Sequence, residues 1–230
     1  SSMPSTSNRS NTEAMPMGDQ RYHMILNGNV GTGGYCTAQP TARNQWLAYL
    51  SVNDVDASYR AALAAGAESV LPPRDYATVG RGAMLRDPGG APFALWKGND
   101  GDRPDATPVP NGDWSWNELW TPDETRALAF YERVFGYTHD TMDIGPQGSY
   151  FLLKKDGVSR AGLMRSTEPA APPMWLPYVE VEDCDAFAAK ARSLAGQIVH
   201  GPTDIPGVGR FAILIDPVGA ALGIIHCTAS

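Results

Sequence analysis

The chain has 230 residues and a formal net charge of −7, with 43% hydrophobic and 19% charged residues. This acidic balance, without a run of lysine or arginine, argues against the basic surface of a protein that binds nucleic acid. No apolar stretch approaches the roughly 18 to 20 residues that span a bilayer, and the start lacks the pattern of a signal peptide. The 3 scattered cysteines lack metal-type spacing and favour a reducing, cytoplasmic location over a disulfide framework.

The sequence repeats itself with an offset of 129 residues, the separation of Trp46 from Trp175. Trp46-Leu47-x-Tyr49 recurs as Trp175-Leu176-x-Tyr178, and Leu85-x-Asp87-Pro88-x-Gly90-Ala91 recurs as Leu214-x-Asp216-Pro217-x-Gly219-Ala220. A repeat of this length is too long for a solenoid and indicates two copies of one domain. We therefore predict a first domain over residues 1–98, a linker over 99–112 and a second domain over 113–230.

The second copy begins after the linker, which is polar and rich in proline and glycine. Residues 114–119 alternate as in a short strand, and Thr121-Pro-Asp-Glu then has the features of a helix start. Apolar side chains at helical spacing over residues 127–135 continue this helix to Gly136, where it should end.

More strands and a second helix follow. The strand-like segments are 150–153, 161–164, 175–181, 198–200, 211–215 and 221–225, and the helix runs from Asp183 to Gly196. We interpret this order as two β-α-β-β-β halves, and predict eight strands and two main helices over residues 113–226. Each half is too small to bury a sheet face alone. The halves should therefore pair into one curved, mostly antiparallel sheet around a cavity, which is an α+β fold.

The first copy is incomplete, because its opening strand and most of its first helix have no counterpart at this offset. Residues 1–14 are polar and cannot replace these elements. We therefore expect an unpaired sheet edge and uncovered apolar side chains around residues 22–26 and 46–50. Exposed surface of this kind favours self-association, so we expect a homodimer or a larger assembly at micromolar concentration.

Three patterns in the second copy carry a resemblance to a known superfamily. They are Thr121-x-Asp123 with Phe130-Tyr131-x-x-Val-Phe-Gly136, Trp175-x-x-Tyr178-x-x-Val-x-Asp183, and Pro202-x-Asp204-Ile-Pro-Gly-Val-Gly-Arg210 with Asp216-Pro-x-Gly219. The chain resembles the vicinal oxygen chelate superfamily, also called the glyoxalase, bleomycin-resistance and dioxygenase superfamily. Within it, the chain is similar to a two-domain actinobacterial branch that includes a mycobacterial antigen and proteins labelled hydroxylases. The resemblance leaves the activity open, because this fold hosts lyases, isomerases, dioxygenases and drug-binding proteins.

The resemblance also implies where metal ligands would lie, on the first, fifth and last strands of a domain. These positions are Asn117, Met174 and Gly223 in the second copy, with Gln45 and Ala94 at the last two in the first copy. A shift of one residue would bring Glu118 or Trp175 into place. Neither copy assembles the imidazole and carboxylate ligands that a divalent ion needs, so we predict no metal and no cofactor.

Glu118 lies among tryptophans in a predicted strand, where a carboxylate is costly unless it is paired. It is either a catalytic base with a raised pKa or a structural group in an ion pair or hydrogen bond across the domain interface, which we favour. The histidines His23, His139, His200 and His226 differ between the copies and fit surface or strand-end positions. Arg81 and Arg210 occur in both copies with an aspartate upstream, so we predict structural ties rather than anion clamps.

The aromatic residues are the remaining signal of function. A curved sheet whose concave face carries tryptophan, tyrosine and methionine forms a pocket for a planar, apolar ligand. The predicted ligand contacts are Asn117, Leu119, Met174, Trp175, Tyr178, Gly223, Ile225, Trp46 and Trp96. We predict a metal-free protein that binds a hydrophobic or aromatic small molecule, for sequestration, resistance or biosynthesis. The alternative is a lyase, isomerase or oxygenase of the same superfamily that uses Glu118 or a histidine as acid or base.

Overall fold

The computed structural model describes residues 14–17, 20–37, 43–77, 79–166 and 171–228. The chain divides into two compact units, residues 1–43 and residues 44–230, and each is described by itself. In the described ranges, no helix is long and apolar enough to cross a membrane.

The first unit is a three-stranded antiparallel sheet. Its strands are β1 (Ala14–Met17), β2 (Gln20–Asn27) and β3 (Val30–Tyr35), in this order across the sheet. The turn between β2 and β3 contains Gly28 with φ +61°, a left-handed conformation that favours glycine. Most of the polar start of the chain, residues 1–13, lies outside the described residues.

The second repeat has the predicted element order. Its first half consists of β8 (Trp114–Thr121), α2 (Glu124–Phe135), β9 (Thr138–Asp143), a 3₁₀ turn η1 (Gly145–Gln147), β10 (Ser149–Lys155) and β11 (Val158–Arg165). Its second half consists of β12 (Met174–Glu180), α3 (Cys184–Ser193), β13 (Gln197–Ile205), β14 (Gly209–Ile215) and β15 (Ala221–Cys227). The prediction of two β-α-β-β-β halves is confirmed, with β9 as the strand that the sequence pattern did not locate.

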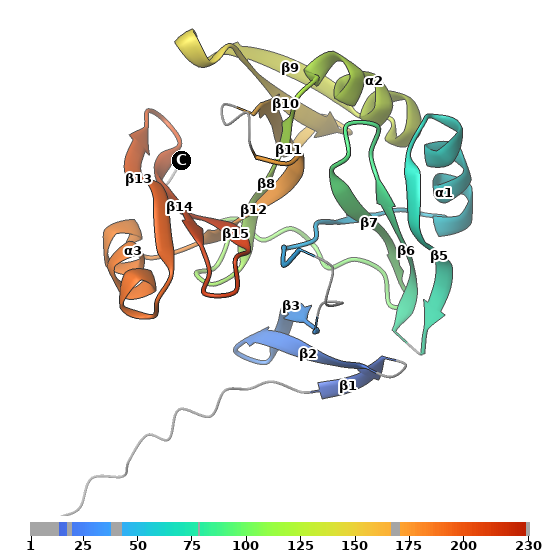
Figure 1. Cartoon of the computed structure of the whole chain (residues 1–230), viewed down its shortest axis with the longest axis horizontal. Coiled ribbons are helices and arrows are strands. Elements are labelled where there is room, and N and C mark those ends of the chain that lie inside the picture. The colour runs from blue at the N-terminus through green and yellow to red at the C-terminus, as the bar shows by residue number, and fades with distance from the viewer. Residues whose placement is uncertain (1–13, 18–19, 38–42, 78, 167–170, 229–230) are drawn as a thin grey trace, which may run out of the picture. The chain divides into compact units, whose positions relative to one another are not determined.

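The two halves of the second repeat form one eight-stranded sheet (Figure 1). Its strand order is β13-β14-β15-β12-β8-β11-β10-β9. The halves meet where β8 pairs antiparallel with β12, and each opening strand pairs parallel with the last strand of its own half, β8 with β11 and β12 with β15. The opening strands therefore lie at the centre of the sheet, where both edges of each strand pair with a neighbouring strand.

Local sequence sets both helix starts of this repeat. Asp123 precedes α2 and accepts a hydrogen bond from the Arg126 amide at 3.0 Å, and Asp183 caps α3 through the Ala186 amide at the same distance. Gly136 ends α2 in a left-handed conformation with φ +67°. These caps explain why the Asp and Gly signals in the sequence predicted the helix boundaries closely.

The first repeat contributes a third β-α-β-β-β module to the second unit. It consists of β4 (Tyr49–Ser51), α1 (Val55–Ala64), β5 (Glu68–Tyr76), β6 (Gly80–Arg86) and β7 (Pro92–Gly98). These strands form a four-stranded sheet in the order β4-β7-β6-β5. By the repeat, β4 matches β12, but no strand among the described residues of the first repeat takes the place of β8. In the described ranges, the first repeat shows no counterpart of β8 or α2.

The edge position of β4 bears on the expected self-association. Among the described residues, β4 is the edge strand of the four-stranded sheet, and Tyr49 in this strand is 56% exposed. An edge strand with an exposed aromatic residue can pair with another chain. We therefore expect sedimentation at micromolar concentration to show a species at least twice the 24.7 kDa of one chain. A single species at the monomer mass would contradict this prediction.

The repeated arginines are structural ties, as predicted. Arg81 pairs with Asp56 in α1 at 2.7 Å and with Asp75 in β5 at 3.0 Å. Arg210 forms the same two pairs in the second repeat, with Asp185 at 2.6 Å and with Asp204 at 3.0 Å. Because each arginine joins a helix start to a strand, its guanidinium is engaged by the protein itself.

One core cluster joins the two repeats within the second unit. Phe93 of β7 packs against Phe130 and Tyr131 of α2, and Leu119 of β8 lies in the same cluster. Figure 1 shows α2 lying beside α1. The four-stranded sheet and the first half of the second repeat are therefore packed together through their helices.

Candidate functional site

The eight-stranded sheet has one face that packs against helices and one face on which no described helix residue packs, which we call the open face. On the covered side, Leu119 and Trp175 belong to the core cluster that contains α2. On the open face, Leu176 and Tyr178 form a separate cluster without any helix residue. Residues two positions apart in one strand, and residues paired across neighbouring strands, lie on the same face of a sheet. The residues of the open face include Trp116, Glu118, Trp120, Tyr150, Gly162, Met174, Leu176, Tyr178, Phe211, Ile213, Gly223 and Ile225.

The structure corrects the predicted face of three residues. Leu119 and Trp175 are buried on the helix side, where the Trp175 indole Nε1 donates to the Tyr131 hydroxyl at 3.0 Å. Asn117 alternates with Glu118 and therefore shares the face of Leu119. The one-residue shift in register places Glu118, rather than Asn117, on the open face. Leu119 and Trp175 are therefore core residues, and neither they nor Asn117 lie on the open face.

The other predicted contacts in this repeat share the open face. Met174 pairs with Trp120, and Gly223 pairs with Tyr178. Ile225 lies in the same cluster as Tyr178. The structure therefore brings four of the predicted contacts together around Glu118.

Glu118 is held by aromatic hydrogen-bond donors. Its Oε1 atom accepts from the Trp120 indole Nε1 at 2.6 Å and from the Tyr178 hydroxyl at 3.3 Å. Tyr150 also hydrogen-bonds the carboxylate, while its hydroxyl accepts from the Trp116 indole at 3.0 Å. The sequence predicted that Glu118 forms an ion pair or a hydrogen bond across the domain interface. Glu118 does form hydrogen bonds, but all of these partners belong to its own sheet.

Burial sets the protonation of this cluster. Desolvation raises the pKa of the Glu118 carboxyl, and the hydrogen bonds from Trp120, Tyr150 and Tyr178 offset part of this rise. Desolvation and the adjacent carboxylate also raise the pKa of Tyr178 and of Tyr150, which keeps both hydroxyls protonated. The site therefore contains two protonated hydroxyls, those of Tyr150 and Tyr178, and the Glu118 carboxyl with a raised pKa.

Two glycines make room for the tyrosine rings. A Cβ atom on Gly162 would collide with the Tyr150 hydroxyl and approach the Trp116 indole to 3.1 Å. A Cβ atom on Gly223 would lie 2.3 Å from the ring of Tyr178. The Tyr150 side chain thus crosses β11 at Gly162 on the way to Glu118, and the Tyr178 ring lies against Gly223 of β15 while its hydroxyl reaches Glu118 on the adjacent β8.

The surroundings of Glu118 are aromatic and partly accessible. Trp116, Trp120, Met174 and Phe211 are half-buried around the buried Tyr178. The exposed imidazole of His200, on β13, stacks on Phe211 with ring centroids 5.1 Å apart. The open face thus offers flat apolar side chains, with polar groups at its centre.

The ligand positions implied by the superfamily do not fit a metal ion. Met174 offers only a thioether, Gly223 has no side chain, and Glu118 is already engaged by Trp120 and Tyr178. In the described part of the chain, no group of three or more His, Cys, Asp or Glu side chains is arranged to hold a metal.

The four-stranded sheet carries its own aromatic cluster. Trp96 lies within 6.1 Å of the Tyr49 ring and 5.6 Å of the Tyr76 ring, measured between centroids. Gly80 and Gly82 give its indole space on β6. Trp46, in contrast, packs edge-on against Trp114 at 5.2 Å, and its indole nitrogen is buried. Trp96 is thus placed on a sheet surface, whereas Trp46 lies in a contact between the repeats.

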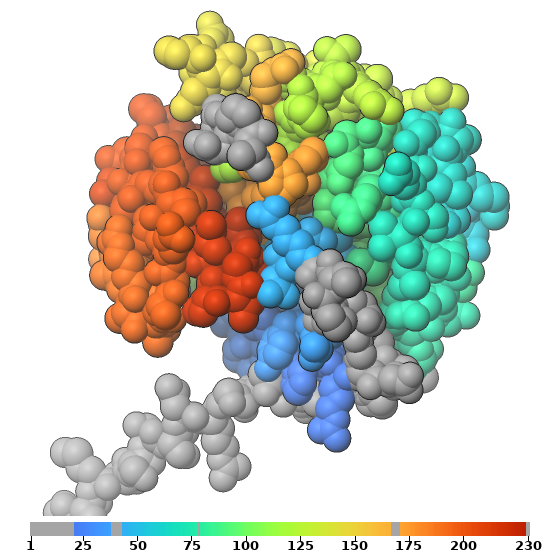
Figure 2. Space-filling view, viewed as in Figure 1, coloured from blue at the N-terminus to red at the C-terminus, as the bar shows by residue number. Residues whose placement is uncertain are grey.

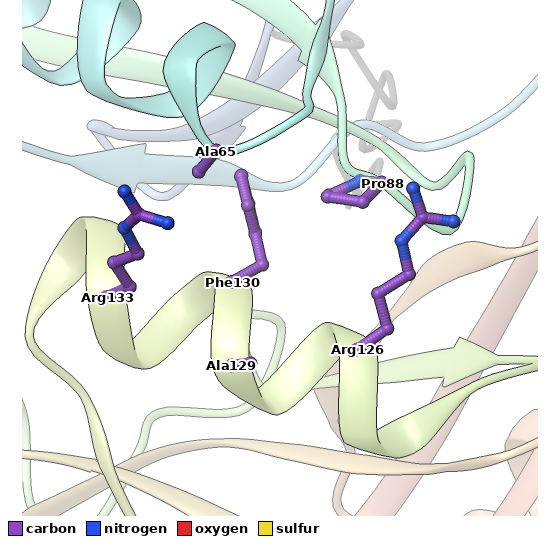
Figure 3. A pocket seen from close by; sticks show the side chains of 6 residues that line it. All are labelled: Ala65, Pro88, Arg126, Ala129, Phe130 and Arg133. Carbon is purple, nitrogen blue, oxygen red and sulfur yellow. The ribbon is translucent and has the colours of Figure 1, made fainter.

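A cavity of about 180 Å³ lies elsewhere, between α1 and α2 (Figure 3). It is lined by Ala65, Pro88, Arg126, Ala129, Phe130 and Arg133. Its walls come from helices and one turn, and none of its lining residues belongs to the open face. We treat it as a packing gap at the contact between the modules.

Paired β-α-β-β-β modules that share one sheet are thus the architecture of the second repeat. Residues 115–224 match the family model of the Glyoxalase/Bleomycin resistance protein/Dioxygenase superfamily. The chain belongs to this superfamily.

Curated relatives support the same assignment. "Putative glyoxylase CFP32" of Mycobacterium bovis is 40% identical over 181 residues, which cover 78% of this chain and 69% of that protein. "Anthracycline biosynthesis protein DauV" of Streptomyces sp. (strain C5) is 33% identical over 182 residues, 79% of this chain and 65% of that protein. The chain thus spans about two thirds of the length of these relatives.

The fold also matches solved structures. A Mn(II)-bound glyoxalase from Novosphingobium aromaticivorans superposes with a TM-score of 0.57 at 17% identity, covering 94% of this chain and 74% of that one. Identity at this level shows the shared fold alone. The superfamily resemblance predicted from the sequence is confirmed.

Replacing Glu118 with glutamine should change how stability depends on pH. Because burial raises the folded-state pKa of Glu118, the folded protein binds more protons than the unfolded chain above pH 4.5, the ordinary value. The contribution of Glu118 to stability is therefore complete at lower pH and is lost as pH rises through the folded pKa. Glutamine does not ionise, so the variant does not lose this stability as pH rises, and its side-chain oxygen can still accept hydrogen bonds from Trp120 and Tyr178.

Thermal unfolding of both proteins across pH 5 to 8 measures the difference. The advantage of Glu118→Gln over the native protein should grow as pH rises. The buried Asp87, whose pKa burial also raises, is present in both proteins and cancels in the comparison. An advantage that stays constant or shrinks with rising pH would contradict the assigned protonation.

Proposed function

We propose that the protein binds a planar, largely apolar aromatic molecule on the open face of the eight-stranded sheet. One observation carries this proposal. Half-buried Trp116, Trp120, Met174 and Phe211 surround the buried Glu118 cluster on a face where no helix residue packs in the described part of the chain. Flat aromatic side chains favour a flat ligand through stacking and apolar contact.

The polar centre of the face suits a ligand with a few oxygen substituents. The protonated hydroxyls of Tyr150 and Tyr178 and the carboxyl of Glu118 can exchange hydrogen bonds with phenol or ketone groups. The name of one relative refers to the biosynthesis of anthracyclines, which are planar aromatic compounds with such groups. We therefore propose that the protein sequesters or handles an oxygenated aromatic compound without a metal. We place it in the cytoplasm, where free cysteines stay reduced.

A second candidate function is catalysis by Glu118 as general acid or base. The observation that favours it is the raised pKa of a buried carboxyl beside two tyrosine hydroxyls. His200 on the same face is a further proton carrier. Such chemistry would isomerise or cleave a bound ligand by moving a proton. Conversion of a bound oxygenated aromatic compound, abolished by Glu118→Gln without loss of binding, would support this candidate.

Fluorescence titration tests the binding proposal. We expect dihydroxyanthraquinone, a planar probe, to quench tryptophan emission with little dependence on salt, because the described residues of this face include no cluster of lysine or arginine. Trp116→Ala should weaken binding by about 1–3 kcal/mol, the range for loss of an aromatic anchor. Metal analysis of the same sample shows whether a divalent ion contributes.

The matched control is Phe187→Ala, which removes an aromatic side chain that is 42% exposed on α3, away from the open face. It should leave the affinity unchanged. Equal affinities for the native protein and Trp116→Ala, or binding that requires a stoichiometric metal, would contradict the proposal.

A further inference from the structure

The four-stranded sheet of the first repeat carries aromatic side chains on the face opposite α1. The ion pair between Arg81 of β6 and Asp56 of α1 identifies the helix side of this sheet. Because side chains alternate along a strand, Gly80 and Gly82 lie on the other side. Pairing with these two glycines places Trp96, Tyr76 and Arg74 on that side as well. We call this surface the Trp96 face, and it consists of Tyr49, Trp96, Tyr76 and Arg74.

The Trp96 indole lies flat over β6. A Cβ atom on Gly80 would lie 2.7 Å from its Cζ2 atom, and a Cβ atom on Gly82 would lie 2.9 Å from its Cε3 atom. These two atoms lie on opposite sides of the six-membered ring, so the ring spans both glycines. One face of the indole therefore lies against the backbone of β6. The residue is only half-buried, and the other face of its ring points away from the sheet.

The second repeat does not reproduce this arrangement. At the offset of 129 residues, Trp96 corresponds to Ile225 and Gly82 corresponds to Phe211. Arg74 corresponds to Thr203, so the positive charge is also particular to the first repeat. The Trp96 face and the open face of the eight-stranded sheet therefore differ both in the position of their aromatic rings and in charge.

Arg74 places a positive charge beside the aromatic rings. Its guanidinium carbon lies 4.6 Å from the centroid of the Tyr76 ring, and this ring lies 5.6 Å from Trp96 between centroids. Arg74 is exposed on the edge strand β5, and Figure 2 shows α1 and β5, in cyan to turquoise, on an outer surface of the second unit. Among the described residues, no carboxylate forms an ion pair with Arg74. A guanidinium that stacks on a ring keeps its N–H donors at its edge, where they fit a carboxylate.

An acidic side chain lies at the opposite edge of this sheet. Ser51 of β4 hydrogen-bonds Asp102, and β4 is separated from β5 by β7 and β6. Strand pairing places Ser51, Trp96, Gly82 and Arg74 in one row across the sheet. Neighbouring strands are about 4.8 Å apart, so Ser51 and Arg74 are separated by roughly 14 Å. An anionic group is therefore attracted at the β5 edge and repelled at the β4 edge.

We propose that the Trp96 face binds a planar aromatic carboxylate. The ring of this ligand stacks on the outward face of the Trp96 indole, beside Tyr49, and its carboxylate accepts hydrogen bonds from the Arg74 guanidinium. Arg74 pairs with Gly82, over which the indole extends, so one small molecule can make both contacts. This site is separate from the open face of the eight-stranded sheet, and the proposal does not depend on the ligand proposed there.

The probe is 2-naphthoate, and 2-naphthamide is its neutral counterpart of nearly the same shape. We expect 2-naphthoate to shift the Trp96 indole N–H signal saturably in ¹H–¹⁵N NMR spectra of the full chain. Its affinity should fall as the salt concentration rises, because the charge of Arg74 is exposed to solvent. The amide should bind the Trp96 face about tenfold more weakly, since a hydrogen bond between two charged groups is lost.

Substitutions separate the charge from the stacking. Arg74→Gln should lower the affinity for 2-naphthoate about tenfold and leave the affinity for 2-naphthamide unchanged. The matched control is Arg60→Gln, which removes the same charge from an exposed position on α1, on the other side of the sheet, and should change neither affinity. Trp96→Leu should weaken the binding of both compounds alike, because it removes the stacking surface.

Thermal unfolding of each variant shows that it folds, and the exposed Arg74 keeps the test decisive if Trp96→Leu does not. Absence of 2-naphthoate binding, or equal affinities of the native protein and Arg74→Gln, would overturn the proposal. An equal loss in Arg60→Gln would overturn it as well. Shifts confined to Trp116 and Trp120 would place the compound on the open face, which contradicts this proposal and leaves the proposed function standing.

Discussion

Replacing Trp175 with alanine should lower the free energy of unfolding by about 3–5 kcal/mol and leave the affinity for a planar aromatic ligand unchanged. Trp175 is 9% exposed, packs against the Tyr131 ring at 5.4 Å between centroids, and donates to the Tyr131 hydroxyl. Its removal leaves a large cavity on the helix side of the sheet. Chemical denaturation and fluorescence titration of the same variant measure the two quantities.

Trp116→Ala is the control for this prediction, because Trp116 lies on the open face and is only half-buried. It should show the reverse pattern, with a larger loss of affinity than of stability. Weaker binding by folded Trp175→Ala protein, measured below its unfolding transition, would contradict the assignment of the two faces.

Replacing Tyr131 with phenylalanine should destabilise the protein by about 2–4 kcal/mol, although only one oxygen atom is removed. The substitution leaves the buried Asp87 carboxylate and the Trp175 indole without the hydroxyl that connects them. Tyr131 is itself 2% exposed, so solvent cannot readily replace this hydroxyl. Denaturant unfolding monitored by circular dichroism measures the loss.

Tyr59→Phe provides the comparison for Tyr131→Phe. Tyr59 donates to Ser69 at 2.5 Å in an exposed bond, so water can replace the partner and the loss should stay below about 0.5 kcal/mol. Similar losses in the two variants would mean that the Asp87–Tyr131–Trp175 chain contributes no more than a surface hydrogen bond.

The sequence predicted the helices of the second repeat because short-range features of the sequence determine where they begin and end. The capping residues Asp123 and Asp183 and the left-handed Gly136 act within a few residues of themselves, and the repeat showed each signal twice. β9 was not located, because Thr-His-Asp-Thr-Met-Asp is exposed throughout and has no apolar alternation. Its pairing with β10 in the sheet decides its conformation.

The site was predicted less well because it depends on register and on distant contacts. Counting residues back from Asp123 placed the site on Asn117, and an error of one residue moves a strand position to the opposite face. The alternation of Trp116, Glu118 and Trp120 was available as a signal that these three share a face. Tyr150 could not be found in this way, since its contact with Trp116 joins residues 34 positions apart.

The indole N–H signals of the 6 tryptophans show most directly whether a bound ligand lies on the open face. A ¹H–¹⁵N NMR titration with dihydroxyanthraquinone reports on each indole separately. Binding on the open face should shift the signals of Trp116 and Trp120 and leave the signal of Trp175 in place. Shifts confined to Trp175 and Trp46, or no shift at Trp116 and Trp120 at saturation, would contradict the account.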